Sequence, residues 1–178
     1  MTMPFHPRSF VAWGVAVFCF LSLVGRGLAA PPQILVGPFD MFDTSADQRP
    51  AVIAAQQQWV DAAAQVFTEK LNASLRLQVQ DSAAAKTALA GIAADYDHPS
   101  ACRGCLLAAA RKTGAAYVFI GAVHKVSDLI IYLGGELDEV STGKPLMSEM
   151  IEVKADDATM LRRAAATMAA DTLAHLPS

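Results

Sequence analysis

The chain of 178 residues lacks most of the sequence features that identify enzymes and nucleic-acid-binding proteins. It contains no Gly-x-Ser-x-Gly sequence, no phosphate-binding loop and no dinucleotide fingerprint, so the common hydrolase, kinase and dehydrogenase classes lack their anchoring motifs. Its 14 basic and 17 acidic side chains are interspersed. Because phosphate binding needs clustered Lys and Arg, we expect no nucleic-acid binding. We also identify no catalytic residues, and we expect no enzymatic activity, no cofactor and no bound metal.

Long apolar runs are missing too. The one near the start, Phe10–Gly25, would reach about 24 Å as a helix, short of a bilayer core of roughly 30 Å. Arg8 precedes this run, and the small residues Gly27 and Ala29 follow it. A basic start, a short apolar segment and a small-residue exit predict a secretory signal peptide over residues 1–29. The alternative is an uncleaved membrane anchor.

After cleavage, residues 30–178 would form a single domain in the periplasm without a stable membrane span. The signal peptide holds two arginines and no acid, so twelve basic and seventeen acidic side chains remain, a net charge of about −5. Cys19 follows Phe18, whereas lipid attachment needs a small residue before the cysteine, so we do not expect a lipoprotein.

The patterns along the remaining chain predict an α/β (α+β) domain. Strict alternation marks half-buried strands, and apolar residues at helical spacing mark amphipathic helices. The first helix has its apolar face at Ile53, Val60 and Phe67, with Gln56 on another face, and Asp40 to Asp47 is predicted to be a loop. The predicted strands are 33–36, 75–80, 117–126, 129–140 and 146–154, and the predicted helices are 50–72, 83–93, 100–112 and 158–175.

This order, β-α-β-α-α-β-β-β-α, predicts a five-stranded mixed sheet packed with helices on one or both faces. Hairpins join the last three strands, which must therefore be antiparallel. Gly134-Gly135 within a strand indicates a bulge or a close backbone approach rather than a ligand site. The oxygen-rich segment around Asp40 and Asp43 has the ligands for calcium, but a turn that solvates its own polar groups is favoured.

Two segments resemble a known domain family. Thr113–Val123 (TGAAYVFIGAV) and Leu137–Leu146 (LDEVSTGKPL) are similar to the strand and hairpin of the TolB amino-terminal domain and of the CsgG-like domains of curli secretion. The first strand and its loop, Ile34–Ser45, fit the same family. The chain also resembles small periplasmic bacterial proteins of unassigned function. The resemblance implies a TolB amino-terminal-like fold and an exported protein that binds other cell-envelope proteins.

Only two cysteines, Cys102 and Cys105, follow the predicted signal peptide. An oxidising compartment favours a disulfide between them, and residues three apart on a helix lie about 5 Å apart, within disulfide range. A thiol-exchange role is the alternative, because the peptide dipoles at a helix start acidify a thiol. Metal binding would need further ligands, with His98 or His124 as candidates. Covalent haem would need a histidine where Leu106 stands.

We therefore expect a periplasmic binding or assembly protein that acts through an exposed sheet edge or through the groove beside the first helix. One alternative is a thiol–disulfide protein that uses Cys102 and Cys105. Another, implied by the resemblance to the small periplasmic proteins, is an accessory factor of a periplasmic quinoprotein dehydrogenase system.

Overall fold

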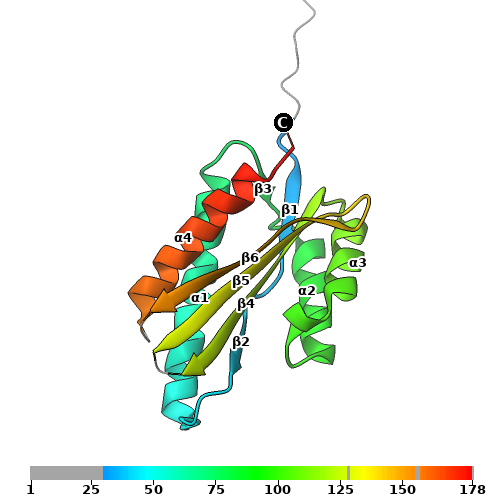
Figure 1. Ribbon diagram of the computed structural model, residues 1–178. Coiled ribbons are helices and arrows are strands. Elements are labelled where there is room, and N and C mark those ends of the chain that lie inside the picture. Colours follow the sequence, from blue (N-terminus) through cyan, green and yellow to red (C-terminus); the bar gives the residue numbers. More distant parts are fainter. Residues whose placement is uncertain (1–29, 128, 155–156, 178) are drawn as a thin grey trace, which may run out of the picture.

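The computed structural model describes residues 30–127, 129–154 and 157–177 (Figure 1). The predicted signal peptide lies outside these residues. The elements are β1 (Gln33–Val36), β2 (Asp40–Asp43), α1 (Pro50–Asn72), β3 (Gln78–Val79), α2 (Ala83–Asp95), the short 3-10 helix η1 (Pro99–Ala101), α3 (Arg103–Thr113), β4 (Tyr117–Ser127), β5 (Ile130–Glu139), β6 (Lys144–Lys154) and α4 (Ala158–Ala174).

One mixed sheet runs through the domain in the order β3-β1-β4-β5-β6. β3, β1 and β4 are parallel, whereas β4, β5 and β6 form the predicted antiparallel hairpins. The sheet has a sixth strand that the sequence analysis assigned to a loop. This strand, β2, pairs in parallel with the second half of β4, where Phe42 lies opposite His124. Its pairing partner is about 80 residues away in the sequence, so no local pattern marks it.

Helices cover the sheet unequally. α1 and α4 lie side by side on one face and form the larger core with it, around Phe67, Phe119 and Met168. α2 and α3 lie on the other face, beside β1 and the first half of β4, with a smaller core around Leu106 and Val118. The rest of this second face, over β5, β6 and the end of β4, has no helix in front of it in Figure 1.

The first helix begins and ends where the sequence predicts. Pro50 stands in its first turn, where the missing N–H would have no partner in any case. Its buried face differs from the prediction at two positions: Gln56 is almost fully buried, and Ile53 is 45% exposed. The strand predicted over 75–80 shrinks to two paired residues. Arg76 instead turns toward the end of α4 and donates to the carbonyl oxygens of Leu173 and Leu176.

The predicted ends of the later elements are mostly confirmed. Ser82 and Asp157 accept hydrogen bonds from the first turns of α2 and α4. Gly114 ends α3 with a φ of 75°, the left-handed conformation that glycine tolerates. One expected cap was wrong: Ser100 lies in η1 rather than at the start of α3, and its N–H donates to Asp40 Oδ2 at 2.6 Å.

The two adjacent glycines of β5 mark a close approach and not a bulge. A Cβ on Gly135 would lie 2.5 Å from Met168 Sδ and 2.7 Å from Phe119 Cζ, so only glycine lets α4 pack against the sheet here. Gly134 points to the opposite face, where a Cβ would meet nothing closer than 3.6 Å. The register shifts of the sheet lie elsewhere, at Val126 and at Leu146.

Candidate functional site

The uncovered part of the second sheet face forms one continuous surface, which we call the open face. Alternation along the strands places its residues opposite the core: Val123, Leu133 and Ile151 pack toward α1 and α4, so their neighbours point away from these helices. Met150, on the outer strand β6, is 62% exposed. The open face consists of Phe42, Ala122, His124, Ile130, Tyr132, Gly134, Ser148, Met150, Glu152 and Lys154.

An aromatic stack forms one side of the open face. The ring of Phe42 lies between two imidazoles, 5.0 Å from that of His124 in a stacked arrangement and 4.4 Å from that of His98. Strand register continues the row across the sheet, from His124 to Tyr132 and on to Glu152. The sequence analysis offered His98 or His124 as candidate ligands for a metal alternative, whereas here both imidazoles pack against the ring of Phe42.

A pocket of about 420 Å³ adjoins this stack beside the first helix. Phe42 and His98 line its sheet side, and Gln48, Ile53 and Gln57 line its helix side. The groove beside the first helix that the sequence analysis proposed as a binding site therefore exists, and it is continuous with the open face through Phe42.

A buried polar cluster lies behind the pocket. The amide of Gln56 donates to Asp43 Oδ2 at 3.0 Å and accepts from Lys125 Nζ at 2.6 Å when it is oriented to satisfy both groups. Burial by itself would raise the pKa of Asp43, but hydrogen bonds from Ser45 and the charge of Lys125 hold it below the usual value. The cluster thus ties β2, α1 and the end of β4 together at the floor of the pocket.

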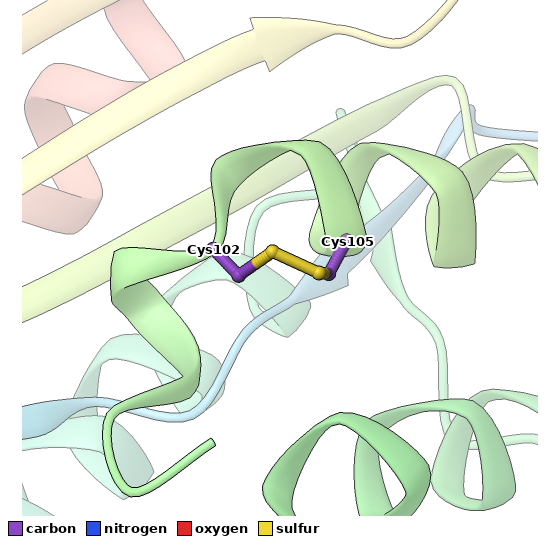
Figure 2. The surroundings of a disulfide bond; sticks show 2 residues. All are labelled: Cys102 and Cys105. Atoms are coloured by element: carbon purple, nitrogen blue, oxygen red, sulfur yellow. A yellow bond between two sulfur atoms is a disulfide. The ribbon is translucent and has the colours of Figure 1, made fainter. Parts of the chain in front are cut away.

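The cysteine pair lies at the start of α3, where Arg103 contacts Glu136 of β5. Cys102 stands just before the first turn of α3 and Cys105 lies within it, with their Cα atoms 5.3 Å apart and their sulfur atoms bonded (Figure 2). Both side chains are half-buried. The geometry is therefore that of a disulfide closing a single turn, as the spacing predicted.

Arg103, between the two cysteines, anchors this turn to the sheet. Its Nε forms a short hydrogen bond with Glu136 of β5, and its Nη2 donates to the carbonyl oxygen of Gly143 at 2.9 Å. The same Nη2 lies 2.9 Å from Asp138 Oδ2. At the other end of α3, Arg111 donates to the carbonyl oxygen of Val140 at 3.3 Å. Two arginines thus fasten α3 to the end of the β5–β6 hairpin.

Asp138 is the buried carboxyl group that Arg103 compensates. Its side chain is fully buried, and neither carboxylate oxygen accepts a hydrogen bond of normal geometry from the residues that the structure describes. Burial, reinforced by the nearby Glu136 carboxylate, raises the pKa of Asp138, while Arg103 acts in the opposite direction. The Arg103 guanidinium is therefore the main compensation for a carboxyl group placed in the core.

The calcium-binding alternative for the segment after β1 finds no support in the geometry. Asp40 and Asp43 point to opposite faces of β2: Asp40 accepts from Ser100 and Asp43 from Ser45. Within residues 30–127, 129–154 and 157–177, no group of three or more His, Cys, Asp or Glu side chains converges on a metal-sized site. No helix among these residues is both long and apolar enough to cross a membrane.

Sequence reasoning found the cysteines and the groove but missed the groups that connect them to the sheet. Arg103 is separated from Glu136 and Asp138 by more than thirty residues, and Gln56 from Lys125 by almost seventy. The one available signal was the position of Asp138 and Lys125 in strands otherwise rich in apolar residues, since a charge on a buried face needs a partner.

Several solved structures have a similar fold. The LpoB C-terminal domain from Salmonella enterica aligns with a TM-score of 0.48 at 16% identity, over 72% of this chain and 87% of that one. Lipoprotein GNA1162 from Neisseria meningitidis aligns with a TM-score of 0.46 at 19% identity, over 80% and 99% of the two chains.

TolB from Acinetobacter baumannii is also among these structures, and the two sequence segments named above resemble the amino-terminal domain of the TolB family. It aligns with a TM-score of 0.46 at 15% identity, over 83% of this chain, which spans only 29% of the TolB chain. A sequence comparison with curated proteins found no match.

A family model matches residues 32–173, which include every helix and strand of the domain except the last residue of α4. The chain therefore belongs to the family described as "Protein of unknown function (DUF2380)".

Proposed function

We propose that this protein is an exported binding module of the bacterial cell envelope, which docks a partner protein on its open face. The observation that carries the proposal is the uneven covering of the sheet: four helices leave the β4–β6 hairpins bare on one side. The bare surface displays Phe42, Tyr132 and Met150 among polar neighbours. Aromatic residues and methionine are enriched in protein interfaces relative to the rest of the surface.

The chemistry of the open face favours a protein surface over a small ligand or nucleic acid as the partner. The face is broad, and its charges, Glu152 and Lys154, are of both signs and lie at its β6 side. The complementary partner would present apolar side chains with flanking charges of both signs. The pocket beside α1 would receive one projecting side chain of this partner, next to the ring of Phe42.

Export is the second component of the proposal. It rests on the amino-terminal sequence, with its basic start, short apolar run and Gly27-x-Ala29 exit. The cysteine geometry agrees with export, because disulfides form and persist mainly in oxidising compartments. An accessory role in a quinoprotein dehydrogenase system would be one form of this function, with a dehydrogenase component as the partner.

Site-specific photocrosslinking in living cells tests the proposal. A photoreactive amino acid replaces Tyr132 on the open face, and in a matched control it replaces the exposed Thr87 of α2 on the covered side. We expect discrete crosslinked species from position 132 that mass spectrometry assigns to an envelope protein, and none of these from position 87. Equal yields from both positions, or crosslinks to cytoplasmic proteins alone, would contradict the proposal.

A further inference from the structure

β6 is the outer strand at one end of the sheet, and the two-residue β3 is the outer strand at the other end. β6 is 11 residues long and pairs only with β5 among the described residues. An unpaired edge of this length offers a row of free N–H and C=O groups to another strand. Proteins usually protect such edges with proline, with bulges or by keeping the edge strand short.

Protection of this kind is confined to one end of β6. Pro145 has no N–H, and Leu146 is an extra residue in the register, because Leu137 lies opposite Met147 while Asp138 lies opposite Pro145. From Met147 to Val153 the strand is regular and contains neither proline nor glycine. Seven consecutive residues are therefore able to pair.

We propose that this segment pairs antiparallel with the same segment of a second copy, about a two-fold axis through Met150. In that register Met150 lies opposite the partner's Met150. The remaining pairs are Glu149 with the partner's Ile151, Ser148 with the partner's Glu152, and Met147 with the partner's Val153. Met150 meets Met150 and Met147 meets Val153, the Ser148 hydroxyl can donate to the Glu152 carboxylate, and Glu149 opposite Ile151 is the one mixed pair; no like charges face each other.

The charge pattern of the strand selects this register. A two-fold axis through Glu149 or Glu152 would place two identical carboxylates directly opposite each other, which is unfavourable. An axis through Ile151 would place two apolar residues, Met150 and Val153, opposite carboxylates, whereas the axis through Met150 does so only for Ile151. An axis through a residue also keeps α1 and α4 of both copies on the same side of the joined sheet, because paired residues in antiparallel strands share a face.

Pairing through β6 would therefore join the two open faces into one surface of double width, on the side away from α1 and α4. This inference extends the proposed function, since it adds a second copy beside the partner's docking face. The two proposals fail separately, because the β6 edge can remain unpaired while the open face of a single copy still binds its partner.

Sedimentation analysis of the full chain, purified from cells that export it, tests the pairing. Met150→Lys and Met150→Glu each place like charges opposite each other at the axis. Because Met150 is 62% exposed, neither change should disturb the fold of one copy, as a thermal melt would verify. We expect a wild-type dimer, a dimer dissociation constant at least about tenfold higher in either variant, and a restored dimer when the two variants are mixed in equal amounts.

Leu75→Lys is the matched control, because Leu75 is an equally large apolar residue that is 92% exposed and follows α1, near the opposite edge strand β3. It should leave the dimer unchanged. A wild-type protein that stays monomeric up to about 100 µM would overturn the inference. So would a dimer that Leu75→Lys weakens but Met150→Lys does not, or a mixture of the two Met150 variants that stays monomeric.

Discussion

Arg103 Nη2 lies 2.9 Å from Oδ2 of Asp138, and this contact joins the cysteine turn to the core of the sheet. Asp138 is fully buried, whereas the side chain of Arg103 is 41% exposed. The contact therefore places a solvent-accessible cation over a carboxyl group that water does not reach. It also explains why a turn of only four residues, closed by its own disulfide, is held in one place beside the open face.

Replacing this cation should weaken the fold in a pH-dependent way. Arg103→Gln should lower the free energy of unfolding by about 1–3 kcal/mol at pH 7, because Asp138 loses its charged partner. The pKa of Asp138 is already raised above its ordinary value of 3.8, so the carboxyl group becomes protonated in the folded state before it does in the unfolded chain. Below that raised pKa the group needs no cation, and the loss should shrink as the pH falls toward 4. Urea titrations at several pH values measure this.

Asp138→Asn is the control for that experiment, since the amide fills the same space without a charge. In the Asp138→Asn background, Arg103→Gln should lower the free energy of unfolding by less than it does in the wild-type background. The difference measures the interaction between the two residues. A loss from Arg103→Gln that is constant from pH 4 to pH 8 would show that the arginine stabilises through packing or through Gly143 instead.

The two cysteines can be tested against the thiol-exchange alternative. A disulfide that closes so short a loop restricts the unfolded chain little, so replacing both Cys102 and Cys105 by Ser should cost about 2 kcal/mol or less. Crosslinking from the open face should persist in this variant. The alternative predicts instead that the capture of partners disappears and that the pair has a reduction potential well above the roughly −300 mV typical of structural disulfides.

The polar cluster behind the pocket predicts a contrast between two adjacent glutamines. Gln56→Ala should lower the free energy of unfolding by about 1–3 kcal/mol, because it removes a hydrogen-bonding partner from both Asp43 and the buried Lys125. Gln57→Ala changes an exposed side chain that donates a hydrogen bond to Asp61 on the same helix, and it should have almost no effect.

The same cluster has a pH signature of opposite sign to that of Asp138. The pKa of Asp43 is held below 3.8 in the folded state, so its ionisation stabilises the fold at neutral pH, and this contribution is lost as the pH falls through the lowered pKa. Gln56→Ala should move the pKa of Asp43 back up, which NMR titration of the carboxyl group would detect. An unchanged titration would mean that Ser45 and Lys125 alone set this pKa.

The adjacent glycines of β5 provide a third matched pair. Gly135→Ala should destabilise the fold by about 1–3 kcal/mol, because the new methyl group would overlap Met168 and Phe119 in the main core. Gly134→Ala, on the open face, meets only ordinary contact distances, and it should be neutral or stabilise the strand by up to about 1 kcal/mol. Equal effects in thermal melts would contradict the assignment of faces on which the open face depends.

The sequence predicted those elements whose cause is local. α1 was found at its observed bounds because proline, apolar spacing and polar faces all lie within its own 23 residues. β2 was missed because its four residues gain their stability from pairing with β4, far along the chain. Gln56 was assigned to solvent for the same reason, since Asp43 and Lys125 reach it only after the sheet has formed.

The candidate site divides in the same way. The Cys102–Cys105 pairing was expected from the spacing together with an oxidising compartment, and the groove beside α1 was proposed next to a helix that the sequence placed correctly. The open face could not be predicted from the sequence, because it depends on where α2 and α3 come to lie over the sheet. Along β5, Tyr132, Gly134 and Glu136 alternate with core residues, which indicates a second face of the sheet. The pattern does not show whether a helix covers that face.

The central claim, that a partner docks on the open face, is tested most directly by NMR. The partner identified by crosslinking is titrated into the isotope-labelled protein, and amide shifts are mapped onto the structure. The account predicts that the largest shifts cluster at Ala122, His124, Tyr132 and Gly134, with little change in α2. Shifts confined to α2 and α3, or no shifts at saturating partner, would contradict it.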